Sequence, residues 1–231
     1  MLGVALLVVA LLSFVAGTTS LVLRHAGNQS VTGQPGVGQP PPLGPHPDWT
    51  TLINPAGGLR YQIPPSGWRP ENAAGGDIGQ VRLRQGAYFT AYTCGTPAKI
   101  YQRGQLGSGS APKTDPAVLA TSLARLAAIS YYTPAGGTAP PTITVAGAEP
   151  VQRTLANGSS VSGVQVEAIA NQQGDPCLAS QGEILVLVFA LADRDAVLIV
   201  NGDTQGGPAS PPPATDDELQ AILDTATPTT S

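Results

Sequence analysis

The two cysteines are the residues of this chain whose chemistry is easiest to name. Cys94 and Cys177 are the only cysteines among its 231 residues. In an exported domain we expect them to form a disulfide. The bond would close the loop from residue 94 to residue 177, which is 84 residues counted inclusively. A disulfide across a loop of this length stabilises a fold by about 4 to 5 kcal/mol in the chain-entropy model. Two alternatives stay open: a redox pair, for which C-x-x-C spacing is usual, and two buried free thiols in a cytoplasmic domain.

Acidic side chains are the second group that could do chemistry. Asp193 and Asp195 flank one arginine between two apolar runs, where a tight hairpin turn is expected. The alternative is a metal or glycosidase site built on this pair. A further cluster, Asp216, Asp217 and Glu218, is explained by the helix N-terminus that it precedes, because carboxylates stabilise that end of a helix.

The common catalytic and cofactor motifs are missing from the sequence. Both histidines, His25 and His46, precede residue 49, so the folded region lacks the base of a Ser-His-Asp or Cys-His site and the imidazole ligands of zinc. Neither a G-x-S-x-G elbow nor a G-x-x-x-x-G-K-[ST] loop occurs. We therefore predict no catalytic, cofactor-binding or metal-binding residues, and a protein that is not an enzyme.

The charge balance argues against nucleic acid as a partner. The chain carries 11 Lys+Arg and 15 Asp+Glu, a net charge of −4, and its only lysines are Lys99 and Lys113. A nucleic-acid-binding protein usually has a cluster of basic side chains that contacts the phosphate backbone, and this composition does not supply one.

The N-terminus predicts a membrane anchor over residues 1–24. The 22 residues from Leu2 to Leu23 carry no charge and as a helix would be about 33 Å long, enough to cross a bilayer core of about 30 Å. The alternative is a cleaved signal peptide, for which Val15-Ala16-Gly17 offers small residues, and the domain would then be secreted. Arg24 alone would place the rest of the chain in the cytoplasm, but the spacer and the cysteine pair favour an extracytoplasmic domain.

A spacer and one domain follow this segment. Residues 25–48 are rich in Gly, Gln and Pro and nearly free of large apolar side chains, which predicts a disordered linker. Residues 49–228 have the length and patterning of a single domain with a sizeable core. The predicted topology is therefore a single-pass protein of the cytoplasmic membrane with its C-terminal domain outside.

The domain opens with a strand and a corner. Tyr61 lies in an alternating run, "LRYQI", that predicts a half-buried strand, and Pro64 and Pro65 end it because proline cannot donate to a sheet. Gly67 then turns the chain and directs Trp68 back to the core. The alternative for this corner is an exposed tryptophan that stacks on a ligand.

Periodicity and capping signals predict the remaining elements. Two of them are apolar strands joined by the acidic hairpin, and the last is a helix whose capping box pairs Thr215 with Glu218. The predicted strands lie near 81–84, 88–94, 143–145, 151–155, 161–170, 183–192 and 196–203, with a turn at Gln85-Gly86 and a loop over 104–111. The first predicted helix runs from Pro116 to Tyr131 and faces the core with Leu119, Leu123, Leu126 and Ala127. The second follows Thr215 and faces the core with Leu219, Ile222 and Leu223. This is an α+β domain: an antiparallel sheet flanked by two helices.

The order of these elements resembles a known fold family. A strand leading into "IPPSGW", an Ala-rich helix, two apolar strands and a closing "DDELQAILDTATP" resemble the PsbP-like α/β/α sandwich domains over Thr50 to Thr227. These include secreted actinobacterial forms related to LpqN and membrane-anchored actinobacterial domains of unknown function. The resemblance implies an assembly or binding module without a shared catalytic residue.

Two functions remain after this elimination. The first is a membrane-anchored extracytoplasmic binding or assembly module whose ligand is a wall component, a cell-envelope protein or a small apolar molecule. The second is a cell-envelope hydrolase that uses carboxylates alone.

Overall fold

The computed structural model of the chain describes residues 46–134 and 139–229. The predicted anchor and nearly all of the predicted linker lie outside these residues. Within them, no helix is both long enough and apolar enough to cross a membrane. His46 belongs to the described part and stacks on Trp49, with ring centroids 4.0 Å apart.

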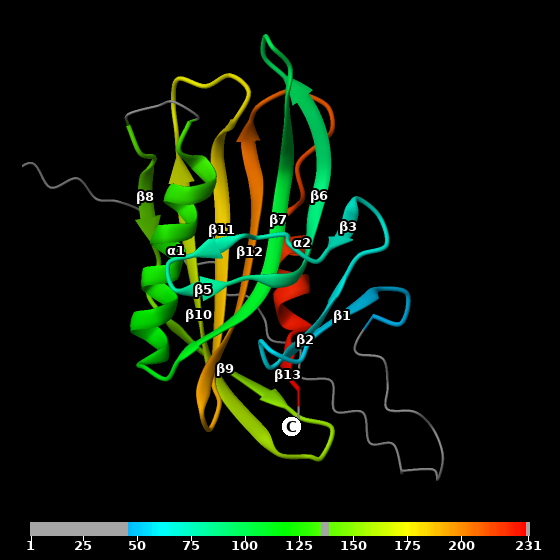
Figure 1. Cartoon of the computed structure of the whole chain (residues 1–231), viewed down its shortest axis with the longest axis vertical. Coiled ribbons are helices and arrows are strands. Elements are labelled where there is room, and N and C mark those ends of the chain that lie inside the picture. The colour runs from blue at the N-terminus through cyan, green and yellow to red at the C-terminus, as the bar shows by residue number, and fades with distance from the viewer. Residues whose placement is uncertain (1–45, 135–138, 230–231) are drawn as a thin grey trace, which may run out of the picture. The chain divides into compact units, whose positions relative to one another are not determined.

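One large antiparallel sheet organises the domain (Figure 1). It has eight strands, and β9 pairs with β10 beside the main path. In spatial order the strands are β3 (Trp68–Glu71), β6 (Arg84–Cys94), β7 (Lys99–Pro112), β12 (Arg194–Gly206), β11 (Ala179–Ala190), β10 (Ser160–Asn171) and β8 (Thr142–Val145), with β9 at Glu149–Thr154. The predicted antiparallel α+β architecture is present.

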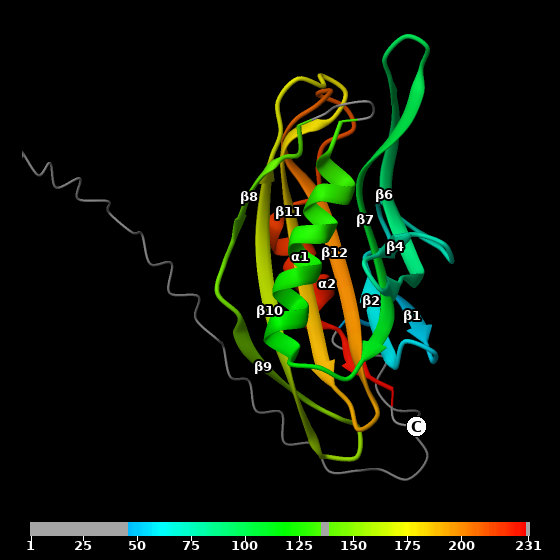
Figure 2. The same ribbon diagram turned by 60° about the vertical axis from the view of Figure 1, so that its left-hand side comes forward.

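Two helices cover opposite faces of this sheet (Figures 1 and 2). Helix α1 (Pro116–Tyr132) packs on β10 and β11, and helix α2 (Asp216–Asp224) packs on β12 and β11. Both begin where the capping signals predict, because Asp115 accepts the backbone N–H groups of the first turn of α1 and Thr215 accepts that of Glu218. Each helix thus has its own hydrophobic core against the sheet.

The two central strands divide their side chains between these cores. Odd-numbered residues of β11, such as Leu185 and Leu187, face α2, whereas even-numbered ones, such as Ile184 and Val186, face α1. All four are buried. The apolar run therefore is a central strand buried on both faces, as predicted.

Smaller sheets complete the fold. β1 (Thr50–Asn54), β2 (Leu59–Ile63) and β13 (Thr227–Pro228) form a three-stranded sheet that adds to the core on the α2 side. β4 (Asp77–Ile78) and β5 (Val81–Arg82) form a two-stranded ribbon.

The predicted loop over 104–111 is wrong, because these residues lie in strand β7. Gly and Ser usually mark loops, but here the missing side chains make room for neighbouring backbone. A Cβ on Gly107 would lie 2.8 Å from the carbonyl oxygen of Ala74, and one on Gly109 would lie 2.6 Å from that of Arg82. The glycines of β7 are therefore required by the segment that crosses over it.

Two further predictions are corrected by the structure. The turn at Gln85-Gly86 is an irregularity inside β6, where the register shifts between Arg84 and Ala87 and Gln85 has a φ of 51°. Such a bulge bends a strand without ending it. Leu126, which the helical pattern places toward the core, is 40% exposed.

Candidate functional site

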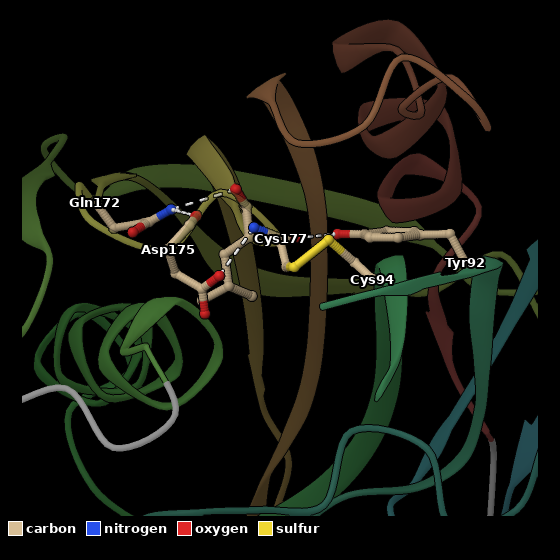
Figure 3. The surroundings of a disulfide bond; sticks show 6 residues. Tyr92, Cys94, Gln172, Asp175 and Cys177 are labelled. Atoms are coloured by element: carbon tan, nitrogen blue, oxygen red, sulfur yellow. Dashed lines mark hydrogen bonds between the residues drawn. A yellow bond between two sulfur atoms is a disulfide. The ribbon is translucent and has the colours of Figure 1, made fainter. Parts of the chain in front are cut away.

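The predicted disulfide joins a hairpin to the loop before the central strand (Figure 3). Cys94 lies at the end of β6, and Cys177 lies between β10 and β11; their Cα atoms are 5.5 Å apart. In the sheet order β7 and β12 separate β6 from β11, so the strands themselves do not meet. The bond forms because β7 pairs with β12 only as far as Gly104, which leaves the tip of the β6–β7 hairpin beyond the sheet.

Polar contacts order the loop that carries Cys177 (Figure 3). The Tyr92 hydroxyl donates to the carbonyl oxygen of Cys177 at 2.6 Å, and Oδ1 of Asp175 accepts the Cys177 backbone N–H at 2.9 Å. Nε2 of Gln172 faces three backbone carbonyl oxygens, the nearest that of Ala179 at 2.8 Å. The loop is thus held by the hairpin on one side and by its own glutamine on the other.

A buried arginine holds the loop after β12. Arg103 is 1% exposed, and its Nη1 lies 3.1 Å from Oδ2 of Asp203. The guanidinium also donates to the carbonyl oxygens of Gly206, Pro208 and Pro211. One side chain therefore ties the end of β12 and the following loop to strand β7.

A pocket of about 470 Å³, within the range usual for ligand sites, lies at the edge of the sheet beside Gln172. The ends of β10 and β12 and the starts of β8 and β11 supply its walls, because antiparallel neighbours bring alternate strand ends to one edge of the sheet. We call it the amide pocket. Its lining residues are Ala139, Pro140, Thr142, Asn171, Gln172, Gln173, Ser180, Gln181 and Gln205.

The amide pocket has a uniform chemistry. Five of its lining side chains are carboxamides, and none of the described lining residues is charged. Nε2 of Gln181 donates to Oδ1 of Asn171 at 3.0 Å, while its Oε1 accepts from the Thr204 hydroxyl at 3.1 Å, so this amide has a fixed orientation. Carboxamides donate and accept hydrogen bonds but have no pKa near neutral pH, so they do not act as general acids or bases. The arrangement suits binding of uncharged polar groups rather than acid–base catalysis.

Gln172 adds a buried acceptor to this pocket. Its side chain is 5% exposed, and its Nε2 faces three carbonyl oxygens, which excludes the flipped orientation because that would set oxygen against oxygen. Its Oε1 has no hydrogen-bond partner among the described residues. A buried amide oxygen without a donor costs about 1 to 3 kcal/mol.

The corner motif lies in the core on the α2 side. Tyr61 and Pro64 are buried, and Trp68 is 4% exposed. Its ring packs on Phe89 at 5.2 Å, and its Nε1 donates to Oε1 of Glu218 at 2.6 Å. Trp68 therefore joins the corner to helix α2 and presents no free ring face on which a ligand could stack.

Beside the corner runs an open groove of about 830 Å³. Pro65, Gly67, Trp68 and Tyr88 are among its lining residues. Because the ring of Trp68 is buried, the groove lacks the exposed tryptophan that the alternative interpretation of the corner requires, and its half-exposed aromatic ring is that of Tyr88.

The acidic residues singled out from the sequence do not converge on a cavity. Asp195 is fully buried in β12, and its Oδ2 accepts the backbone N–H of Thr114 at 2.8 Å, just before α1. Asp193 is exposed, 3.5 Å from Arg194. The cluster from Asp216 to Glu218 occupies the first turn of α2. Across residues 46–134 and 139–229, no group of three or more His, Cys, Asp or Glu is arranged to hold a metal ion.

Sequence analysis missed one acidic residue of interest, Asp203. Burial raises the pKa of its carboxyl from 3.8 to about 6, and the hydrogen bond and charge of Arg103 oppose that rise. The signal was present in "AVLIVNGD", where an aspartate ends a strand that is predicted to be buried. An ionisable group in such a place marks a site of either structural or functional importance.

Residues 43–231 match a family that is described as a domain of unknown function, DUF8017. The match begins just before the first described residue and extends to the last residue of the sequence. It includes both cysteines, the corner and the amide pocket. No curated protein matches the chain.

Proposed function

The chain belongs to the DUF8017 family, and we propose that it is a membrane-anchored extracytoplasmic module that binds an uncharged polar component of the cell envelope without catalysis. One observation carries the proposal: five carboxamide side chains from three neighbouring strands and the loop after β10 line one pocket of about 470 Å³. Hydroxyl and amide groups of a wall polymer are the partners that such side chains bind.

The location of the domain rests on two supports. The Cys94–Cys177 disulfide is of the kind that persists in oxidising compartments outside the cytoplasm. The uncharged run from Leu2 to Leu23 is long enough for an anchor. Alkaline phosphatase fused after Pro47 should therefore be active, and an inactive fusion would reverse the proposed orientation.

The fold supports the proposed kinship. The large sheet with one helix on each face agrees with an α/β/α sandwich of the PsbP-like, LpqN-related type, for which we propose an actinobacterial origin. Such a module would act through a surface site, since the resemblance carries no catalytic residue.

The amide pocket lies toward one end of the domain. Both views place the β10–β11 turn at one end of the domain, and β1, β2 and β13 toward the other (Figures 1 and 2). The described chain starts at His46, which bonds Gln62 in β2. The amide pocket and the start of the described chain therefore lie toward opposite ends of the domain.

The hydrolase alternative has less support. It needs two carboxylates that face one cavity, whereas the buried Oδ2 of Asp195 is engaged by the Thr114 backbone and Asp193 points to Arg194. A small apolar ligand is also less well matched, because amide side chains dominate the amide pocket.

Co-sedimentation with purified, protein-free cell walls tests the proposal. The full chain, held in a detergent without a sugar headgroup, should sediment with the walls, and the Gln181→Ala/Gln205→Ala double variant should lose most of this binding. Gln80→Ala is the matched control, because Gln80 is exposed between β4 and β5, away from the pocket. Equal sedimentation of all three proteins, or of none, would overturn the proposed site.

A further inference from the structure

A second pocket, the tyrosine pocket, lies beside the β6–β7 hairpin and has a volume of about 150 Å³. A cavity of that size holds a molecule as large as benzene. It shares no lining residue with the amide pocket. Its lining residues are Tyr92, Ile100, Tyr101, Gln102, Gly104, Gln105, Tyr131, Tyr132, Leu178, Asn201 and Asp203.

Four tyrosines from two parts of the fold form the walls. Tyr92 and Tyr101 come from the hairpin, and their rings stack with centroids 5.6 Å apart and planes 15° apart. Tyr131 and Tyr132 come from the last turn of α1. The π faces and hydroxyl oxygens of these rings are electron-rich, so they favour positive charge.

The floor is a pair of buried polar side chains from β12. Asn201 is 4% exposed and Asp203 is 5% exposed. The Tyr132 hydroxyl donates its single hydrogen to Oδ1 of Asp203, at 3.4 Å, so it must accept from Nδ2 of Asn201, at 3.2 Å. This chain of bonds fixes the Asn201 amide and leaves its Oδ1 without a partner among the described residues.

The guanidinium of Arg103 lies behind this pocket, where it contacts two of the lining residues, Asp203 and Tyr92. Nε and both terminal nitrogens of Arg103 are engaged by backbone carbonyl oxygens and by Asp203. Its guanidinium carbon also lies 4.9 Å from the centre of the Tyr92 ring. No Lys or Arg is among the described residues that line the tyrosine pocket. The described lining therefore combines the Asp203 carboxylate, which is paired with Arg103, the buried amide of Asn201 and aromatic rings.

We propose that the tyrosine pocket binds a small organic ammonium ion. The N–H groups of the ligand face the side chains of Asn201 and Asp203, its charge is stabilised by the Asp203 carboxylate, and its alkyl groups contact the tyrosine rings. Aromatic rings and the Asp203 carboxylate together favour an ammonium over a neutral alcohol of the same shape, because both molecules can donate a hydrogen bond and only the ammonium is charged. This inference is independent of the proposed envelope ligand, because the two pockets have no residue in common.

Binding should depend on pH through Asp203. The titratable or charged side chains that face it are Arg103 of β7, Tyr132 of α1 and Tyr92 of β6. Burial raises the pKa of Asp203 to about 6, whereas the pKa values of both tyrosines lie far above neutrality for the same reason. Ammonium binding should therefore be strong above pH 6 and weaken as the pH falls below it.

The test compares two probes of one shape, tert-butylammonium and tert-butanol. At pH 7.5, tert-butylammonium should shift the side-chain amide NMR signals of Asn201 in the full chain, with an affinity at least about fivefold higher than that of tert-butanol. At pH 5 this preference should be lost. Equal affinities at pH 7.5, or no shift of these signals by the ammonium, would overturn the proposal.

Variants separate the parts of the site. Tyr101→Leu should weaken ammonium binding about threefold or more, and Tyr88→Leu, which changes a tyrosine of the corner groove instead, should not weaken it. Asp203→Asn should abolish the preference for the charged probe. If Asp203→Asn does not fold because Arg103 has lost its ion-pair partner, the Tyr101→Leu variant decides the test. Tyr101 is half-exposed in the hairpin, so we expect that variant to fold. Unchanged binding by Tyr101→Leu would contradict the site.

Discussion

Nη1 of Arg103 and Oδ2 of Asp203 lie 3.1 Å apart in a place that solvent hardly reaches. The pair links β7 to the end of β12, and the same guanidinium fixes the loop that follows. A buried charge pair of this kind is costly to break, because the remaining charge has no water to solvate it.

Arg103→Met should therefore destabilise the domain strongly. The substitution removes the donor of Oδ2 of Asp203 and of three carbonyl oxygens at the end of β12 and in the following loop, and we expect the free energy of unfolding to fall by about 3 to 5 kcal/mol. Urea denaturation measures the loss. Arg69→Met is the matched control, since Arg69 is exposed on β3 and should cost less than about 0.5 kcal/mol. Similar losses for both variants would contradict the role of Arg103.

The pH dependence of stability should report Asp203. The pKa of its carboxyl is about 6 in the folded state and 3.8 when the side chain is free in water, so the folded state binds the extra proton between these values. The carboxyl therefore contributes stability that is present below pH 3.8 and is lost as the pH rises through 6, by about 2 to 3 kcal/mol. Asp203→Asn should remove this fall between pH 4 and 6. If the unfolding free energies of the original chain and of Asp203→Asn change with pH in parallel, the raised pKa of Asp203 is contradicted.

The disulfide should matter for stability and should report the compartment. Cys94→Ser opens the long loop, and we expect a loss of about 2 to 5 kcal/mol of unfolding free energy. The Cys94→Ser/Cys177→Ser double variant should lose little more, because either change already removes the bond. Non-reducing peptide mapping of protein from the cell envelope should recover the linked peptides. Two alkylatable thiols in that sample would remove the argument for an oxidising compartment.

The corner should be intolerant of a side chain at Gly67. Its φ is 78°, and a Cβ there would lie 2.2 Å from the Phe89 ring. Gly76 is the matched control, because its φ is 64° and a Cβ there would have no atom within 4 Å. Gly76→Ala should cost about 1 to 2 kcal/mol from backbone strain alone, and Gly67→Ala should cost at least about 1 kcal/mol more. Equal costs would mean that Phe89 moves freely.

The sequence predicted those elements whose cause is local. β11 and β12 are evident as long apolar runs, and Thr215 and Glu218 form a capping box that needs no tertiary information. The Cys94–Cys177 bond followed from the count of cysteines and the expected compartment. The strands and the capped helix were predictable because neighbouring residues alone specify them.

Features that depend on distant segments were missed. The glycines of β7 look like a loop, and only the segment from Ala74 to Arg82 that crosses them explains why they form a strand. The amide pocket has the same character, because its side chains come from separate strand ends. The run Asn171-Gln172-Gln173 was its only local signal, and it does not indicate that Gln181 and Gln205 would join it. The pairing of β10, β11 and β12 brings these side chains together, and a local sequence pattern does not predict which strands pair.

The central claim, that the amide pocket binds an envelope component, is tested most directly by the side-chain amide signals in an NMR titration. Soluble neutral fragments of the cell wall are added to the full chain in a detergent without a sugar headgroup. The amide signals of Asn171, Gln172, Gln173, Gln181 and Gln205 should shift together and saturate, while that of Gln80 should not move. Shifts centred on the corner groove, or no saturable shift in these five amides, would contradict the claim.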